Sequence, residues 1–141
     1  MHDIYISGTG VWTPPHKVSN KELVESFNEY VRLYNIENEQ RILDGAVAAL
    51  EPSSEDFIAK ASGILSRYVI DKDSLLNPRI MKPMIEPRDN DALSVSAEIS
   101  VIAAQEALKN AGLQASDIDA VIVSTANLQR AYPAIAIEVQ N

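Results

Sequence analysis

Cysteine is absent from the sequence, and histidine is nearly so. Without cysteine, the 141 residues hold no disulfide bond, no thiolate metal ligand and no cysteine nucleophile. The two histidines are His2, at the terminus, and His16, in a proline-rich turn. A general base is expected in a cleft beside its nucleophile, so we interpret both as surface residues. We accordingly expect no metal site.

Positive charge is also scarce. Twelve Lys and Arg stand against twenty Asp and Glu, which gives a formal net charge of −8. DNA or RNA is therefore not an expected partner, because affinity for nucleic acid comes mainly from neutralising phosphates. An anionic membrane surface is disfavoured for the same reason. No apolar run approaches the length of a transmembrane helix, and no signal peptide is recognisable, so we expect a cytoplasmic protein without membrane contact.

The glycine motifs of common enzymes are missing too. The stretch "SGTG" contains Gly8 and Gly10, but it lacks a third glycine and is followed by Trp and Pro instead of a helix start. No G-x-S-x-G nucleophile elbow and no phosphate loop occurs. We interpret "SGTG" as a turn at the end of a strand that begins near Ile4, where glycine allows backbones to approach closely.

Helical patterns dominate the first half of the chain. Ser19 and Glu22 match a capping box ahead of apolar residues at helical spacing, and a weaker helix-compatible pattern continues from 35 to 50. Ser53 is a candidate cap for a short second helix that ends at Gly63. An extended segment over 64–70 follows. Three prolines then predict an irregular surface excursion from 72 to 90.

The second half predicts a helix followed by a strand. Small apolar residues recur at helical spacing from about 93 to 111, and Gly112 marks the end of that helix. Residues 120–123 are apolar throughout, which indicates a strand in the middle of a sheet covered by helices. The final segment is ambiguous: its apolar residues alternate like a strand, while Pro133 suits the first turn of a helix. The layout is α/β.

A polar run follows the apolar segment 120–123. Open α/β sheets place ligand crevices just beyond the ends of such strands. A turn rich in amides and hydroxyls can also be only a turn, so a ligand or subunit contact and a plain turn both remain open. The run comprises Thr125, Asn127, Gln129, Arg130 and Tyr132.

Four segments, taken in order, resemble the N-terminal portion of beta-ketoacyl-acyl-carrier-protein synthase III, a family of the thiolase-like superfamily. They are "IYISGTGVWTPPHKVSN", "SSEDFIAKASGILSRYV", "SAEISVIAAQEALKNAGLQASDIDAVIVSTAN" and "RAYPAIAIEVQN". The resemblance implies a thiolase-like fold, a mixed sheet sandwiched by helices. Residues 1–141 would form the N-terminal part of its first half-domain and leave the fold incomplete. It also favours a helix beginning near Pro133.

The activity implied by the resemblance is a decarboxylative condensation in fatty acid biosynthesis. A cysteine thiolate accepts an acyl group from acyl-CoA, and the malonyl group on the acyl carrier protein then attacks it. The family's catalytic Cys, His and Asn would all lie outside this chain, which alone should be inactive. No cofactor is expected. The implied partners are acyl-CoA, malonyl-acyl-carrier protein, a second copy in a homodimer, and the remainder of the same polypeptide.

Site residues carry over at few positions. The family's tryptophan that stacks on the CoA adenine falls at Phe57, and its arginine falls at Ala61, with Lys60 adjacent. Tyr132 corresponds to an aromatic that reaches the partner's acyl pocket. We assign Thr125 and Asn127 to the same acyl-pocket or dimer contact. Ordinary helix packing for Phe57 and a plain turn aromatic for Tyr132 are the competing interpretations.

Two regions, at about 33–50 and 72–90, are longer than in members that use acetyl-CoA. Insertions near the CoA-binding segment would remodel the tunnel mouth, so we expect a medium-chain acyl primer. Two other interpretations remain. One is another thiolase-like acyltransferase, such as a hydroxymethylglutaryl-CoA synthase or a quinolone- or polyketide-type enzyme. The other is a non-catalytic partner subunit or small binding module that is complete at this length.

Overall fold

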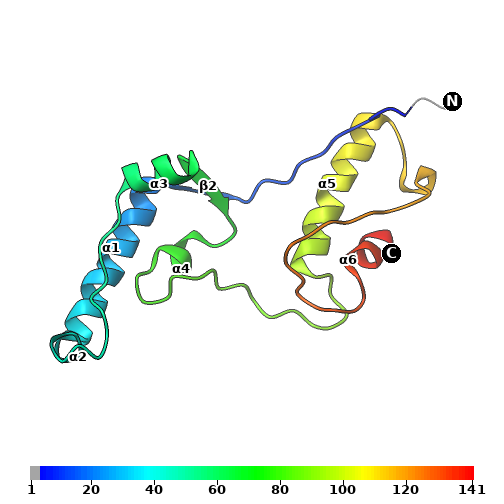
Figure 1. Ribbon diagram of the computed structural model, residues 1–141. Helices are drawn as coiled ribbons and strands as arrows, with labels where there is room; N and C mark the ends of the chain where they lie inside the picture. Colours follow the sequence, from blue (N-terminus) through cyan, green and yellow to red (C-terminus); the bar gives the residue numbers. More distant parts are fainter. Residues whose placement is uncertain (1–3) are drawn as a thin grey trace. The chain divides into compact units, whose positions relative to one another are not determined.

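The computed structural model describes residues 4–141, which form two compact units (Figure 1). The hairpin unit comprises residues 14–86, and the long-helix unit comprises residues 4–13 together with 87–141. The prediction for His2 lies outside the described residues. His16 is exposed, as predicted, although it begins a strand and does not lie in a turn.

The hairpin unit pairs two short strands and surrounds them with helices. Strand β1 pairs antiparallel with β2, and Val18 at the centre of the ladder is fully buried. The extended segment predicted over 64–70 is thus confirmed as β2, whereas β1 falls in a stretch predicted to be a turn. The elements are β1 (His16–Ser19), α1 (Asn20–Glu37), α2 (Glu39–Leu43), α3 (Glu55–Ser62), β2 (Ser66–Val69) and α4 (Lys72–Leu76).

Helix α1 begins at the capping box that the sequence predicts. The Ser19 N–H donates to Glu22 Oε2 at 2.9 Å, and the Glu22 N–H donates to Ser19 Oγ at 3.2 Å. Lys72 Nζ lies 2.5 Å from Glu22 Oε1 and also donates to the Lys17 carbonyl. The bond from Lys72, followed by the bonds from Ser19, lowers the pKa of Glu22 to about 2. One carboxylate therefore joins the start of α1 to α4.

Asparagine side chains hold the chain that returns along α1. Asn28 accepts from the Ser53 N–H at 2.8 Å and donates to the Ser53 carbonyl at 3.0 Å. Asn35 pairs with Leu50 in the same two-way manner, at 2.9 and 3.0 Å. Each asparagine amide satisfies the N–H and C=O groups of one residue in this extended segment, as a neighbouring strand would do in a sheet. The helix-compatible region 35–50 is therefore the end of α1, then α2, then an extended return that Asn35 holds.

The long-helix unit contains α5 (Val95–Ala111), the short 3₁₀ helix η1 (Ala115–Asp117) and α6 (Ile135–Gln140). Helix α5 is confirmed with its predicted end, since Gly112 adopts the left-handed conformation at φ 69°. The ambiguous last segment is helical. It begins at Ile135, two residues later than the predicted start at Pro133.

Two predicted strands are wrong. Residues 4–13 and 118–124 are not strands, and Ile4 and Ile122 are 96% and 93% exposed. Over the described residues 4–141 the only ladder is β1 with β2, so neither segment has a neighbouring strand to pair with. The excursion at 72–90 is also not wholly irregular, because Asp71 accepts from the Ser74 N–H at 3.1 Å and starts α4.

Residues 4–13 pack against α5 instead of entering a sheet. A Cβ on Gly8 would lie 2.3 Å from the Ala107 carbonyl oxygen, and one on Gly10 would lie 2.0 Å from that of Ala103. Asn110 Nδ2 donates to the Thr9 carbonyl at 2.8 Å and secures this approach. "SGTG" does bring backbones close, as predicted, but its neighbour is a helix.

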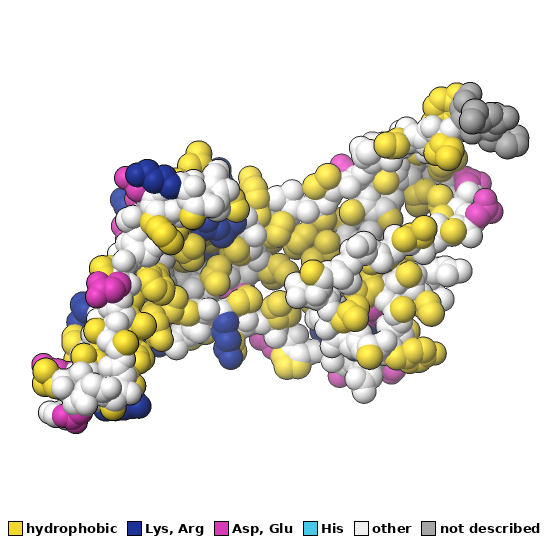
Figure 2. Space-filling view, viewed as in Figure 1, with side chains coloured by type: hydrophobic (Ala, Val, Ile, Leu, Met, Phe, Trp, Pro, Cys, Tyr) yellow, Lys and Arg dark blue, Asp and Glu magenta, His cyan; other side chains and the backbone are white. Residues whose placement is uncertain are grey.

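Apolar side chains are prominent on the surface of both units (Figure 2). Of the described residues, the buried hydrophobic ones are Val18, Val31, Ala97 and Ile135, while Leu43 and Phe57 are largely exposed. Such surfaces are typical of regions that contact another molecule or another part of a protein.

Gly10→Ala should destabilise the long-helix unit. The added methyl group meets a backbone carbonyl that cannot turn aside, and overpacking of this kind costs about 1–3 kcal/mol in free energy of unfolding. Urea denaturation followed by circular dichroism measures the loss. Thr9→Ala is the matched control, because it removes an exposed side chain and retains the carbonyl that Asn110 contacts. Equal stability of the two variants would contradict this packing.

Glu22→Gln should remove part of the acid sensitivity of the hairpin unit. The pKa of Glu22 is about 2 in the folded protein, against an ordinary 4.5. The stabilisation by its charge is therefore complete above pH 4.5 and is lost as the pH falls towards 2. Urea midpoints measured across this range should fall less steeply for Glu22→Gln than for the parent protein. Glu25→Gln, which removes an exposed carboxylate 3.9 Å from Lys21, should keep the parent slope.

Candidate functional site

The two predicted CoA-contacting residues lie on α3. Ser54 caps this helix by accepting from the Phe57 N–H at 3.1 Å, one residue later than the cap predicted at Ser53. Gly63 ends it at φ 70°, as predicted. The Phe57 ring is 66% exposed, and Lys60 is exposed three residues further on. Residues three apart on a helix are neighbours, so α3 presents an aromatic ring and an ammonium group together.

Thr125 and Asn127 close a local turn in the long-helix unit. The Thr125 hydroxyl accepts from the Asn127 N–H at 3.2 Å and donates to the Asn127 carbonyl at 3.1 Å. The hydroxyl thus bonds within the turn. Tyr132 lies further along, and its side chain is 84% exposed. The structure brings Thr125 and Asn127 together and leaves the Tyr132 ring projecting into solvent.

A buried polar network includes Arg130, three residues after Asn127 in the chain. Glu138 is 6% exposed and accepts from the Ser94 hydroxyl at 2.7 Å and from the Ser94 N–H at 3.1 Å. Arg130 Nη2 donates to Glu138 Oε1 and also to the Ala92 carbonyl. Arg130 Nη1 donates to the Asn90 carbonyl at 2.8 Å. We call Ser94, Arg130 and Glu138 the Glu138 network.

The electrostatics of the Glu138 network favour an ionised carboxylate. The hydrogen bond from the Ser94 hydroxyl, and then the Ser94 N–H and the Arg130 charge, hold the pKa of Glu138 below its ordinary value, although burial acts in the opposite direction. Ser94 also caps α5 by accepting from the Ala97 N–H at 3.2 Å. The same hydroxyl therefore starts α5 and binds α6.

Sequence reasoning placed Arg130 in a polar turn but missed Ser94 and Glu138. A signal was present, because Glu138 follows Ile135 by three residues and so shares the buried face of α6. A carboxylate in a position that a helix would give to an apolar residue predicts a buried partner of opposite charge.

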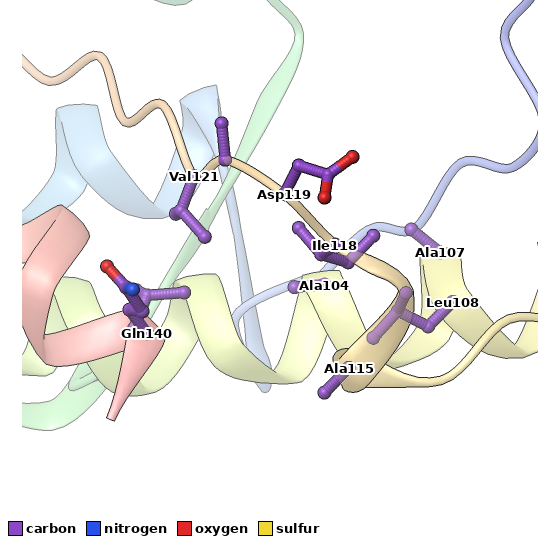
Figure 3. A pocket seen from close by; sticks show the side chains of 10 residues that line it. Ala104, Ala107, Leu108, Ala115, Ile118, Asp119, Val121 and Gln140 are labelled. Carbon is purple, nitrogen blue, oxygen red and sulfur yellow. The ribbon is translucent and has the colours of Figure 1, made fainter.

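An apolar hollow of about 350 Å³ lies between α5, the segment 115–121 and α6 (Figure 3). Ala104, Leu108, Ile118 and Val121 line it, and Asp119 is its only charged lining residue. The hollow contains none of the predicted site residues. Its lining suits an apolar group, and Asp119 is the single carboxylate in it.

No metal centre is present over residues 4–141, where no group of three or more His, Asp or Glu side chains is placed to hold an ion. Within the same residues, no helix is both long and apolar enough to cross a membrane.

Comparison with known proteins finds similar sequences, although no family model matches the chain. The beta-ketodecanoyl-[acyl-carrier-protein] synthase of Pseudomonas aeruginosa is 53% identical over 117 residues, which cover 83% of this chain and 33% of that protein. The beta-ketoacyl-[acyl-carrier-protein] synthase III of Rhizobium rhizogenes is 30% identical over 63% of this chain and 21% of its own length. That of Bartonella tribocorum is 30% identical over 67% and 23%. The chain thus spans a third or less of each of these relatives.

Proposed function

Because the chain belongs by sequence to the beta-ketoacyl-acyl-carrier-protein synthase III family, we propose that the whole protein is a condensing acyltransferase of fatty acid biosynthesis. The 53% identity over 117 residues carries this proposal. Its substrates would be an acyl-CoA and malonyl-acyl-carrier protein, and we place the reaction in the cytoplasm. The fold of the whole protein would be thiolase-like, with residues 1–141 in its first half-domain.

The reaction requires a thiolate that these residues do not supply, since they contain no cysteine. The thiolate attacks the acyl-CoA thioester, and CoA leaves as its thiolate, which then takes up a proton. The malonyl group then loses carbon dioxide, and the resulting enolate attacks the acyl-enzyme. A carbon–carbon bond forms and the thiolate is released. Cys, His and Asn from the remainder of the polypeptide would perform these steps, with donors for the enolate oxygen.

The described residues would serve binding and support. Phe57 would stack on the adenine of CoA, and Lys60 would face its phosphates. Their shared exposed helix supports both roles. The exposed Tyr132 ring would enter the acyl pocket of a second copy in a homodimer, with Thr125 and Asn127 shaping the turn. The apolar surface of both units supports contact with the remainder of the polypeptide.

A medium-chain acyl primer is the finer part of the proposal. The region 33–50 contains α2 and an extended return held to α1 by Asn35, and the region 72–90 contains α4 held to α1 through Glu22. These two regions would form an ordered extension of the hairpin unit beside α3, the proposed CoA-binding helix. The Pseudomonas aeruginosa relative is named for a ketodecanoyl product, and condensation adds two carbons, so octanoyl-CoA is the matching primer for that name.

The whole protein should therefore condense octanoyl-CoA with malonyl-acyl-carrier protein more efficiently than acetyl-CoA. The measurement is kcat/KM for each primer, with release of carbon dioxide as the readout. A strong preference for acetyl-CoA would overturn the primer assignment and leave the condensing activity standing. Failure to condense any acyl-CoA would overturn the activity itself and favour a non-catalytic subunit.

Phe57→Ala should raise KM for acyl-CoA with little change in kcat. Aromatic stacking on a base contributes about 1–3 kcal/mol, so KM should rise by roughly five- to 150-fold. Phe57→Trp should lower KM, because the indole offers more stacking area. Tyr68→Ala, which removes an exposed ring on β2, is the matched control and should leave KM unchanged. A parental KM for Phe57→Ala would show that Phe57 does not contact CoA.

A further inference from the structure

Arg130 and Glu138, which precede and follow Tyr132 in the chain, are largely withdrawn from solvent, whereas Tyr132 is exposed. The side chain of Arg130 is 25% exposed and that of Glu138 is 5% exposed, against 84% for Tyr132. One ion pair therefore joins the two ends of the segment 130–138, and Tyr132 lies within that segment.

The turn before Tyr132 is held by side chains. Gln129 Oε1 accepts from the Ser96 N–H at 3.1 Å, in the first turn of α5. Arg130 donates to the carbonyls of Asn90 and Ala92, in the segment that leads into α5. Gln129 thus binds the first turn of α5, and Arg130 binds the segment that leads into it.

The segment after Tyr132 is held to the same place. Glu138 on α6 binds both the hydroxyl and the N–H of Ser94, the cap of α5. Arg130 donates to the same carboxylate and completes the pairing. The turn, α6 and the start of α5 therefore meet at the Glu138 network.

A network of this kind is better explained by geometry than by stability. Compared with apolar side chains of similar size, a buried ion pair adds little net stability, because desolvation offsets the attraction between the charges. Its directional bonds instead specify one arrangement of the groups that it joins. In this unit the groups that it joins are Arg130 in the turn before Tyr132, Glu138 on α6 and Ser94 at the start of α5.

We propose that Arg130 and Glu138 are positioning residues that set the direction of the Tyr132 ring and thereby the acyl-chain selectivity. This proposal rests on the proposed role of Tyr132 in the acyl pocket. Arg130 fixes the turn on one side of the ring, and Glu138 fixes α6 on the other. Neither side chain need touch the substrate.

The test uses the whole protein and the isosteric change Glu138→Gln. A neutral amide keeps the size of the side chain but cannot accept from Arg130 and Ser94 with a full charge. The ratio of kcat/KM for octanoyl-CoA to kcat/KM for butyryl-CoA should change by about tenfold or more, because small misplacements of a positioning group have large effects. Arg130→Lys, which keeps the charge and loses the forked geometry, should change the ratio in the same direction.

Glu98→Gln is the matched control. Glu98 pairs with Arg88 at 2.5 Å in the same unit, but this pair is 49% and 35% exposed. The other hydrogen bond of Arg88 goes to the Leu93 carbonyl at 3.0 Å and not to the turn before Tyr132. The same chemical change there should leave the selectivity ratio within about twofold of the parent, as expected for an exposed pair. An equal change in Glu98→Gln and Glu138→Gln would overturn the proposal.

A second readout reports on Tyr132 itself. In protein labelled with 3-fluorotyrosine, the Tyr132 fluorine resonance is identified by its loss in Tyr132→Phe, and it should shift or broaden in Glu138→Gln and not in Glu98→Gln. A lower melting temperature with an unchanged resonance and an unchanged ratio would show a purely structural role and overturn the proposal. If Glu138→Gln does not fold, Arg130→Lys decides by the same two readouts.

Failure of the proposed function gives a different pattern. If Tyr132→Ala leaves the selectivity ratio unchanged, Tyr132 does not shape the acyl pocket. In that case a shifted resonance in Glu138→Gln still supports the positioning of the ring, while an unshifted one overturns it. If Tyr132→Ala changes the ratio and both network variants leave it unchanged, the positioning role alone is wrong.

Discussion

Extended backbone needs partners for its N–H and C=O groups, and in this chain side chains provide many of them. Over residues 4–141 the only ladder is the short pair β1 and β2. Elsewhere Asn28 and Asn35 pair with the segment that returns along α1, and Asn110 holds the Thr9 carbonyl against α5. Arg130 holds the segment before α5 in the same way. The positions of the loops, and of the side chains proposed for binding, depend on these bonds.

The two candidate contact residues, Phe57 and Tyr132, differ in what holds them in place. Phe57 stands on a helix whose own cap and C-terminal glycine define it, so local interactions are sufficient to expose the ring. Tyr132 stands outside regular structure, in a segment that only distant contacts can fix. Its support is the Glu138 network, whose members Ser94 and Glu138 are 44 residues apart. Under the proposed role, the direction of the Tyr132 ring would depend on residues that need not contact the ligand themselves.

The helices could be predicted where residues close to a helix end specify that end. Ser19 with Glu22, Gly63 and Gly112 mark ends that the structure confirms, because each acts within one turn of its own helix. Strands were not predictable in this way. Residues 118–124 have the composition of a buried strand, yet they remain unpaired in the described residues, because a strand exists only where a second strand lies beside it. The α/β layout was thus correct in its main helices and in the extended segment 64–70, and wrong in the strands that it placed at 4–13 and 118–124.

The candidate site also has features that the sequence determines and features that only the tertiary structure decides. The sequence by itself determined the chemistry available, which is an aromatic and a cation on α3, a polar turn ending at Tyr132, and no cysteine. It also determined the family, through the order of four segments. Only the tertiary structure decided that Ser94 and Glu138 belong beside that turn, and that Gly8 and Gly10 meet a helix. The physical reason is that caps act between neighbours in the chain, whereas a buried carboxylate finds its partners only when distant segments have packed together.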